Sequence, residues 1–378
     1  MEPRPTTLVA DGLVTGSTLT GPAWVRIDGG RVVATGEGRP PEGLVGVETV
    51  VDGVLAPGFV DIHHHGALGW DYGAGSTDGS LAVVGHHHRQ GSTTLVASLA
   101  TLPLDELELR VEQLGELYAA GSIAGIHLEG PYLAPGHRGC HAPDLLRHPS
   151  VPELRRLLRA APGAVRMVTL APELPGALEA VRLLVDEGVT VAIGHTSCTA
   201  AQAQAAFDAG ATVLTHAYNG MPALHHREPG PLGAALFDER VTLELILDGH
   251  HVSAAPARVL SEVAPERLAL ISDAMAATGM GDGEYTIGGT AVVVKDSVAR
   301  APSNGSLAGS TITVADAFAS AVEVLGMDLP AAVASASTIP ARALGLREPR
   351  IAAGAPADLV VITGGRVSRV MRAGELLT

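Results

Sequence analysis

The feature that most constrains the fold of this sequence is a repeated alternation of apolar strands with amphipathic helices. Eight apolar segments of strand length occur, at Pro57–Gly66, Thr93–Leu99, Ile123–Leu128, Val165–Leu170, Thr190–Ile193, Thr212–Thr215, Thr242–Leu247 and Leu268–Ile271. Helical patterns lie between them, at Asp78–Gln90, Leu104–Ala119, Val151–Ala160, Leu174–Glu187, Thr199–Ala209 and Ala254–Val263, and a loop is expected before Thr242. Eight strand–helix units favour an α/β fold, a (β/α)8 TIM barrel, over an open doubly wound sheet. No G-x-G-x-x-G follows a strand, so a dinucleotide site is not supported.

Both ends of the chain contain short β-like runs separated by glycine and proline turns. They are Thr7–Ala10, Ala23–Ile27, Arg31–Thr35 and Glu48–Asp52 near the start, and Asp358–Ile362 and Val367–Arg372 near the end. We therefore predict a small β-sandwich domain built from residues 1–54 and 348–378, with the barrel domain at 55–347.

The composition excludes several classes of partner. The net charge of −15 argues against nucleic acid or an anionic membrane, which are bound through an excess of Lys and Arg. The only cysteines, Cys140 and Cys198, do not suggest a disulfide framework. The N-terminus has no apolar signal region and no run of 18 apolar residues follows, so we expect a cytoplasmic protein.

Metal-ligand side chains collect where the predicted strands end. In a strand, His63 and His65 point to one face, since side chains alternate. Six strand ends carry such residues, namely His63 and His65, Glu129, His195, His216, Asp248 with His250 and His251, and Asp273. Histidines and carboxylates without cysteine suit Zn²⁺, Fe²⁺, Mn²⁺ or Co²⁺. Asp273 fits a general base for a water that the metal activates. A bridging carboxylated lysine is excluded, because the single lysine, Lys295, follows the last strand.

The motifs H-x-H, H-L-E-G-P, G-H-T, H-A-Y-N-x-M-P, D-G-x-H and S-D-A, in this order, resemble those of the amidohydrolase superfamily. Within it they are similar to the N-acetylglucosamine-6-phosphate deacetylase family, over nearly the whole chain. The resemblance implies one divalent metal on Glu129, His195 and His216. It implies a second through His63 and His65, with Glu129 bridging. One or two ions per subunit are expected, with Zn²⁺ favoured.

The same resemblance implies catalytic and substrate-binding roles. Asp273 would deprotonate the attacking water and return the proton to the departing amine, and His141 would polarise the acetyl carbonyl. Substrate contacts are expected from Cys140, His141, Asn219, Gly220, Arg227, His251, Leu307, Ala308 and Gly309. A homodimer is implied, with Arg227 and His251 near the subunit interface, because family members complete the phosphate site with a neighbouring subunit.

Several alternatives stay open at this point. One alternative is the same reaction on N-acetylgalactosamine 6-phosphate. This sugar differs from the glucosamine derivative at one stereocentre, and the motifs do not distinguish the two. A cyclic-amide hydrolase and a non-catalytic scaffold are more distant alternatives. Cys140 is either a small filler or a redox-sensitive thiol beside the site. We expect His64 to pack against the barrel wall and the run His86–His88 to be a solvated helix end.

Overall fold

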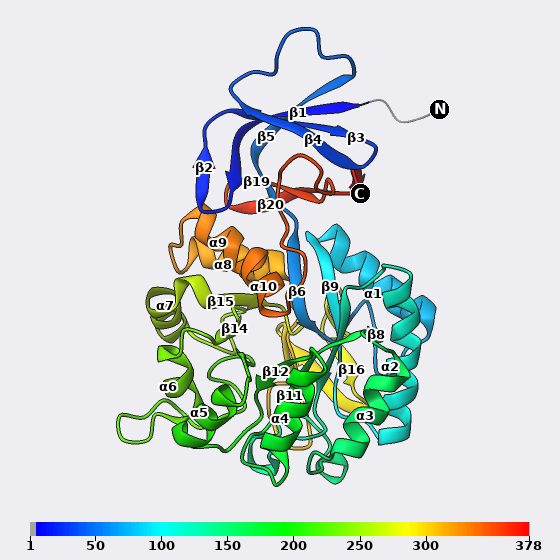
Figure 1. The fold of residues 1–378 in the computed structure, drawn as a ribbon, viewed down its shortest axis with the longest axis vertical. Coiled ribbons are helices and arrows are strands. Elements are labelled where there is room, and N and C mark those ends of the chain that lie inside the picture. Colours follow the sequence, from blue (N-terminus) through cyan, green and yellow to red (C-terminus); the bar gives the residue numbers. More distant parts are fainter. Residues whose placement is uncertain (1–4, 378) are drawn as a thin grey trace.

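The barrel expected from the sequence is confirmed by the computed structural model, which describes residues 5–377 (Figure 1). Its eight parallel strands pair in chain order. They are β6 (Phe59–His64), β9 (Ser92–Leu99), β10 (Gly125–Glu129), β11 (Val165–Leu170), β12 (Thr190–Ile193), β13 (Val213–Leu214), β14 (Thr242–Ile246) and β15 (Leu268–Ile271). Since all the carboxyl ends point the same way, the polar strand ends share one rim.

The first and last barrel strands meet just beyond their carboxyl ends. The Asp273 N–H donates to the His63 carbonyl at 2.8 Å, and the His65 N–H donates to the Ala274 carbonyl at 2.7 Å. Below them the Ser272 hydroxyl donates to the buried Asp61 carboxylate at 2.5 Å. This seam between β6 and β15 therefore places the H-x-H residues beside Asp273.

Helices surround the barrel and pack their apolar faces on it (Figure 1). They are α1 (Thr77–Arg89), α2 (Leu104–Ala119), α3 (Val151–Ala160), α4 (Ala177–Asp186), α5 (Ala200–Asp208), α6 (Gly230–Phe237), α7 (Ala254–Val263), α8 (Val314–Glu323), α9 (Leu329–Ala336) and α10 (Thr338–Ala343). The prediction of a loop throughout the region before β14 was wrong, because this region contains helix α6. That helix begins Gly-Pro-Leu-Gly, a turn-like composition, but packing of Leu232, Ala235 and Leu236 stabilises it.

A three-stranded antiparallel sheet after β15 was not predicted. It consists of β16 (Gly283–Ile287), β17 (Thr290–Lys295) and β18 (Val298–Arg300), and a short hairpin, β7 (Gly66–Ala67) with β8 (Trp70–Asp71), follows β6. Gly288 donates its N–H to the Asp71 carboxylate at 2.7 Å, which ties the two insertions together. The exposed Lys295 lies on β17, outside the barrel strands.

The small β domain is formed by both ends of the chain, as predicted. Its strands are β1 (Thr6–Thr15), β2 (Thr18–Thr20), β3 (Ala23–Asp28), β4 (Arg31–Glu37), β5 (Val47–Pro57), β19 (Leu359–Thr363), β20 (Arg366–Arg372) and β21 (Glu375–Leu377). Antiparallel pairing of β19 with β5 joins the two ends. The sheet is curved around its own apolar core. At one edge, the Val32 N–H on β4 donates to the Ala355 carbonyl at 2.9 Å. Because β5 runs on to Pro57, one strand enters the barrel from the small domain.

Two histidines of α1 are buried, so the prediction that His86–His88 form a solvated helix end was wrong for these two residues. His87 is fully buried and His88 nearly so. The His87 ring lies 4.6 Å from that of His64, and its Nε2 is 3.3 Å from the Gly66 carbonyl. Burial lowers the pKa of His87 to about 3, so the ring is neutral. His64 is buried as expected, with Nε2 3.0 Å from the Tyr72 hydroxyl. Of the described helices, none has the length and apolar character needed to cross a membrane.

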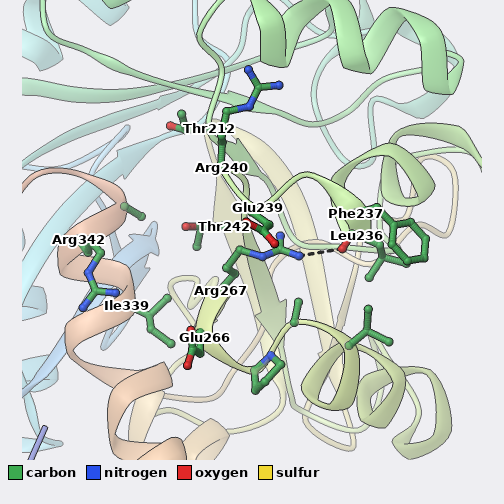
Figure 2. Close-up of a pocket in the computed structure, with 14 residues that line it drawn as sticks. Thr212, Leu236, Phe237, Glu239, Arg240, Thr242, Glu266, Arg267, Ile339 and Arg342 are labelled. Carbon is green, nitrogen blue, oxygen red and sulfur yellow. Dashed lines mark hydrogen bonds between the residues drawn. The ribbon is translucent and has the colours of Figure 1, made fainter. Parts of the chain in front are cut away.

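A cavity of about 820 Å³ lies at the amino-terminal ends of β13–β15, opposite the polar rim. Figure 2 shows Arg267 among its lining residues, with a hydrogen bond to the Leu236 carbonyl. The same guanidinium lies 3.1, 3.0 and 2.6 Å from the carbonyl oxygens of Ala235, Asp238 and Val241. Arg267 therefore holds the carboxyl end of α6, whose last carbonyls have no helical partners.

Replacing Arg267 is expected to destabilise the fold without touching the polar rim. Arg267→Ala leaves four carbonyls without this partner and should lower the free energy of unfolding by about 2–3 kcal/mol. The free energy of unfolding of Arg267→Lys should lie between those of the parent and Arg267→Ala, since an ammonium group cannot reach all four carbonyl oxygens. Urea unfolding measures the change. Arg342→Ala is the matched control in the same cavity, because its exposed side chain bonds only Glu348. Equal losses for Arg267→Ala and Arg342→Ala would contradict this role.

Candidate metal centre

The Glu129 carboxylate, at the end of β10, is the centre of the polar rim. Imidazole Nε2 atoms approach its Oε1 from His195 (3.0 Å), His216 (3.3 Å) and His63 (3.4 Å), and its Oε2 from His65 (3.2 Å) and His141 (3.4 Å). Four of these five histidines come from three other strand ends, and all are buried. The structure therefore brings together the ligands predicted from separate motifs.

Asp273 completes the cluster from the end of β15. Its Oδ1 lies 3.2 Å from His65 Nε2 and 3.5 Å from His63 Nε2. Two groups have ligand atoms within 4.8 Å of one another, namely His63 with His65 and Asp273, and Glu129 with His141 and His195. Among the residues that the structure describes, the buried Nε2 atoms of His63 and His65 have no hydrogen-bond partner. Unpartnered imidazole nitrogens facing two carboxylates fit a divalent metal.

For three of the histidines, the partner of the second ring nitrogen distinguishes candidate metal ligands from a hydrogen-bond donor. His195 Nδ1 lies 2.8 Å from the His137 carbonyl, and His63 Nδ1 lies 3.0 Å from the Glu244 carboxylate. Each Nδ1 therefore carries the proton, which leaves the Nε2 lone pair free for a metal. His141 is the reverse, because its Nδ1 accepts the Thr101 backbone N–H at 3.3 Å. In neutral His141 the proton is on Nε2, so this ring donates into the site.

The electrostatics of the cluster keep both carboxylates ionised. Burial alone would raise the pKa of Glu129, but His63 and the bonding histidines hold that pKa well below its ordinary value. Burial likewise opposes ionisation of Asp273, and its neighbours His63 and His65 still lower its pKa. Burial lowers the pKa of His141, which favours the neutral donor form.

Three site residues have the left-handed backbone conformation that side chains other than glycine rarely adopt. The φ angles are 46° at His195, 28° at His216 and 47° at Asp273. Each residue comes two positions after the end of its barrel strand. Such conformations cost on the order of 1–3 kcal/mol each and persist where surrounding contacts fix them. The chain therefore turns sharply at each strand end to aim the side chain inward.

A cavity of about 220 Å³ opens over Glu129 and Asp273. Of the predicted substrate residues, it is lined by Cys140, His141, Asn219, Gly220, His251, Leu307 and Gly309. Sequence reasoning missed Gly139, Ile246, Ile287 and Ser306, which line it too. Ile287 comes from the unpredicted sheet and had no recognisable signal.

Two predicted substrate residues do not line this cavity. Ala308 is fully buried between its two lining neighbours. Arg227 lies on an exposed loop, with its guanidinium 2.8 Å from His226 Nε2. Their roles in substrate binding stay predictions.

The environment of Cys140 does not activate its thiol. Burial raises the pKa of Cys140, and the charges of Glu129 and Asp273 raise it further. A thiol that stays protonated is a poor nucleophile and is not readily oxidised. Cys140 is half-buried and lines the cavity, and the redox-sensitive thiol stays a prediction.

Glu244 was not predicted, although it contacts two site histidines. It lies in the middle of β14 and is fully buried. Besides His63 Nδ1, its Oε2 accepts the His216 backbone N–H at 3.2 Å. A signal was present in the sequence, since a single carboxylate interrupts an apolar strand whose residues should all be buried.

Comparison with known proteins assigns the chain to a family. Residues 54–377 match the Amidohydrolase family, and the chain belongs to it. Solved and curated relatives have narrower names. A mutant of N-acetyl-D-glucosamine-6-phosphate deacetylase from Mycobacterium smegmatis, solved in complex with N-acetyl-D-glucosamine-6-phosphate, is 46% identical, with a TM-score of 0.96 and 99% of each chain covered.

Two curated relatives carry different sugar names. N-acetylgalactosamine-6-phosphate deacetylase of Escherichia coli O157:H7 is 41% identical over 297 residues, 78% of each chain. N-acetylglucosamine-6-phosphate deacetylase of Bacillus subtilis (strain 168) is 31% identical over 366 residues, 93% of this chain and 91% of the relative. The predicted resemblance is thus confirmed, and the relatives share deacetylation of a phosphorylated amino sugar.

Removing the H-x-H pair is expected to remove one metal position. His63→Ala/His65→Ala should bind one divalent ion per subunit where the parent binds two, because Glu129, His195 and His216 remain. Metal analysis after dialysis at fixed free metal measures the count. His148→Ala/His250→Ala, two exposed histidines outside the cluster, is the control and should match the parent. An unchanged count in the His63/His65 variant would show that this pair holds no ion.

Proposed function

We propose that this protein is a metal-dependent deacetylase that hydrolyses N-acetyl-D-glucosamine 6-phosphate to D-glucosamine 6-phosphate and acetate. The observation that carries the proposal is the cluster at the rim, in which an ionised Asp273, a neutral donor His141 and a set of free imidazole lone pairs face one cavity. The relatives named as deacetylases of phosphorylated amino sugars supply the substrate class.

A divalent metal held by Glu129, His195 and His216 would polarise an amide carbonyl and lower the pKa of a water molecule. The residues of the chain do the rest. Asp273 accepts a proton from the attacking water as a new C–O bond forms at the acetyl carbon. When the C–N bond breaks, the same proton passes to the amine nitrogen, so acetate and the amino sugar leave. Its lowered pKa keeps Asp273 ready as the base.

His141 stabilises the oxygen on which negative charge develops. Its Nε2–H points toward Glu129 and the cavity, and Thr101 fixes this tautomer from the other side of the ring. A hydrogen-bond donor placed before reaction needs no reorganisation in the transition state, and such donors contribute several kcal/mol.

The sugar and its phosphate need contacts beyond the metal cluster. Asn219, Gly220, His251, Leu307 and Gly309 line the cavity and would hold the sugar ring. Asp248 accepts the His251 Nδ1–H at 2.7 Å, which leaves Nε2 directed elsewhere. The lining contains no arginine or lysine, although a phosphate is best bound by such a group.

Arg227 is our candidate for that missing positive charge, supplied between subunits of a homodimer. The loop that carries it projects from the barrel between β13 and α6 (Figure 1) and is exposed over residues 223–229. We propose that its guanidinium reaches the phosphate in the partner's site, near His251. In this proposal Zn²⁺ is favoured over Fe²⁺, Mn²⁺ and Co²⁺, the H-x-H position is the weaker one, and the enzyme acts in cytoplasmic amino-sugar catabolism.

Acetate release tests the proposed reaction. The metal-loaded protein should release acetate from N-acetylglucosamine 6-phosphate and much less from unphosphorylated N-acetylglucosamine. Asp273→Asn should lower kcat by about 10²- to 10⁴-fold, because it removes the base, while metal analysis still finds the ion held by Glu129, His195 and His216. No acetate from any phosphorylated amino sugar would overturn the proposal, and loss of all metal in Asp273→Asn would contradict the role of Asp273.

N-acetylgalactosamine 6-phosphate is the second candidate substrate, favoured by the 41% identical relative of that name. The glucosamine derivative is preferred because the relative that matches 99% of the chain at 46% identity is named for it. The ratio of kcat/KM for the two epimers decides between them.

Arg227→Ala should raise KM for the phosphorylated sugar by roughly 10- to 100-fold, since a charge-assisted hydrogen bond is lost. KM for the unphosphorylated sugar should be unchanged. Co-expression of Arg227→Ala with Asp273→Asn distinguishes an arginine that acts in its own subunit from one that acts in the partner's site. If the arginine acts across the interface, mixed dimers contain one intact site and activity returns. If activity does not return while mixed dimers form, Arg227 does not act in trans.

A further inference from the structure

One buried carboxylate contacts ligands of both candidate metal positions. Glu244 Oε2 lies 3.0 Å from His63 Nδ1 and 3.2 Å from the His216 backbone nitrogen. His63 belongs to the H-x-H position and His216 to the position built on Glu129. Among the described side chains that are not themselves candidate ligands, no other has hydrogen bonds to a histidine of each position.

The surroundings of Glu244 imply that its burial destabilises the fold, which is unexpected for a residue with a purely structural role. Its strand neighbours Leu243 and Leu245 face the helices, so Glu244 points into the barrel. The barrel interior contains an apolar cluster that includes Val213 and Ile246, and the polar side chains of Thr169 and Thr215 bond each other. Glu244 is fully inaccessible to solvent, and its Oε1 has no hydrogen-bond partner. A carboxylate in such a place destabilises the fold by several kcal/mol unless its contacts compensate.

The contacts that Glu244 makes are those that fix metal ligands. By accepting the Nδ1–H of His63 it sets the tautomer and the ring orientation, so that Nε2 lies 3.5 Å from the Asp273 carboxylate. The other H-x-H residue lacks such support, since neither ring nitrogen of His65 has a hydrogen-bond partner. The second contact holds the amide of His216, whose φ of 28° is strained. Within the described residues His216 Nδ1 has no hydrogen-bond partner, so Glu244 acts on this residue through its backbone, as does the Asn219 N–H that the His216 carbonyl accepts.

We infer that Glu244 is a positioning residue that sets the affinity of the H-x-H metal position and links it to the Glu129 position. Partners of this kind change metal affinity by about 10- to 100-fold. The larger effect falls on the H-x-H position, because His63 is its only oriented ring. The Glu129 position changes less, because Glu129 and His195 do not depend on Glu244. The inference rests on the metal centre and not on the substrate.

Metal titration of Glu244→Gln tests the inference. The glutamine keeps the shape of the side chain but lacks the charge. We expect the weaker metal position to lose about 10- to 100-fold in affinity and the stronger one less than about tenfold, measured with Co²⁺ by absorption and by metal analysis after dialysis. The metal-free variant should melt at the parent temperature or above, because a buried charge is removed.

The matched control is Thr169→Val. Thr169 is as buried in the barrel as Glu244, but it bonds His127. Both ring nitrogens of His127 form hydrogen bonds with hydroxyl groups, so His127 has no nitrogen left to bind a metal. This control should leave both affinities unchanged. If Glu244→Gln does not fold, Glu244→Asp keeps the charge on a shorter side chain and should show the same selective loss.

Two results would overturn the inference. One is parent-like affinity at both positions in Glu244→Gln. The other is an equal loss at both positions together with a lower melting temperature of the metal-free protein, which is what a merely structural residue would give. Neither result depends on acetate release, so the proposed substrate can fail while this inference stands, or the reverse.

Discussion

The site depends on the concentration of imidazoles around the Glu129 carboxylate. Two Nε2 atoms, those of His195 and His216, lie only 3.1 Å apart. Nitrogens this close repel if both carry lone pairs or both carry protons, and a shared cation removes the conflict. The strained backbone at three strand ends and the buried carboxylate beneath them serve the same arrangement. The rest of the barrel supplies a rigid frame that holds these groups against their mutual repulsion.

Much of the fold could be predicted because its signals are local. The strand and helix periods placed six helices within a few residues of their observed ends, and the rim followed once parallel strands were assumed. The candidate metal ligands could also be predicted, since each lies at or just after the end of an apolar strand. Pairing of β5 with β19 could be inferred only in outline, because a sheet made from distant segments has no local signature.

The parts that were not predicted depend on three-dimensional context. Helix α6 has a turn-like sequence and forms because its apolar face is buried and Arg267 binds its end. His87 is inside because of where α1 packs, which a run of three histidines does not reveal. The division of roles between His141 and the ligand histidines depends on which neighbour bonds the far ring nitrogen, and only coordinates give that. Arg227 is the opposite case, because a motif predicts it as a substrate residue but it does not line the cavity within one chain.

The seam between β6 and β15 has a consequence for biosynthesis. Asp61 and Ser272, which bond across it, are 211 residues apart. The H-x-H pair therefore leaves the ribosome long before the strand that brings Asp273 beside it. A chain that ends before β15 lacks Asp273, the proposed base, although His63, His65 and Glu129 have already been synthesised. Because the seam needs residues from both ends of the barrel sequence, the proposed active site cannot be complete until residue 273 has been synthesised.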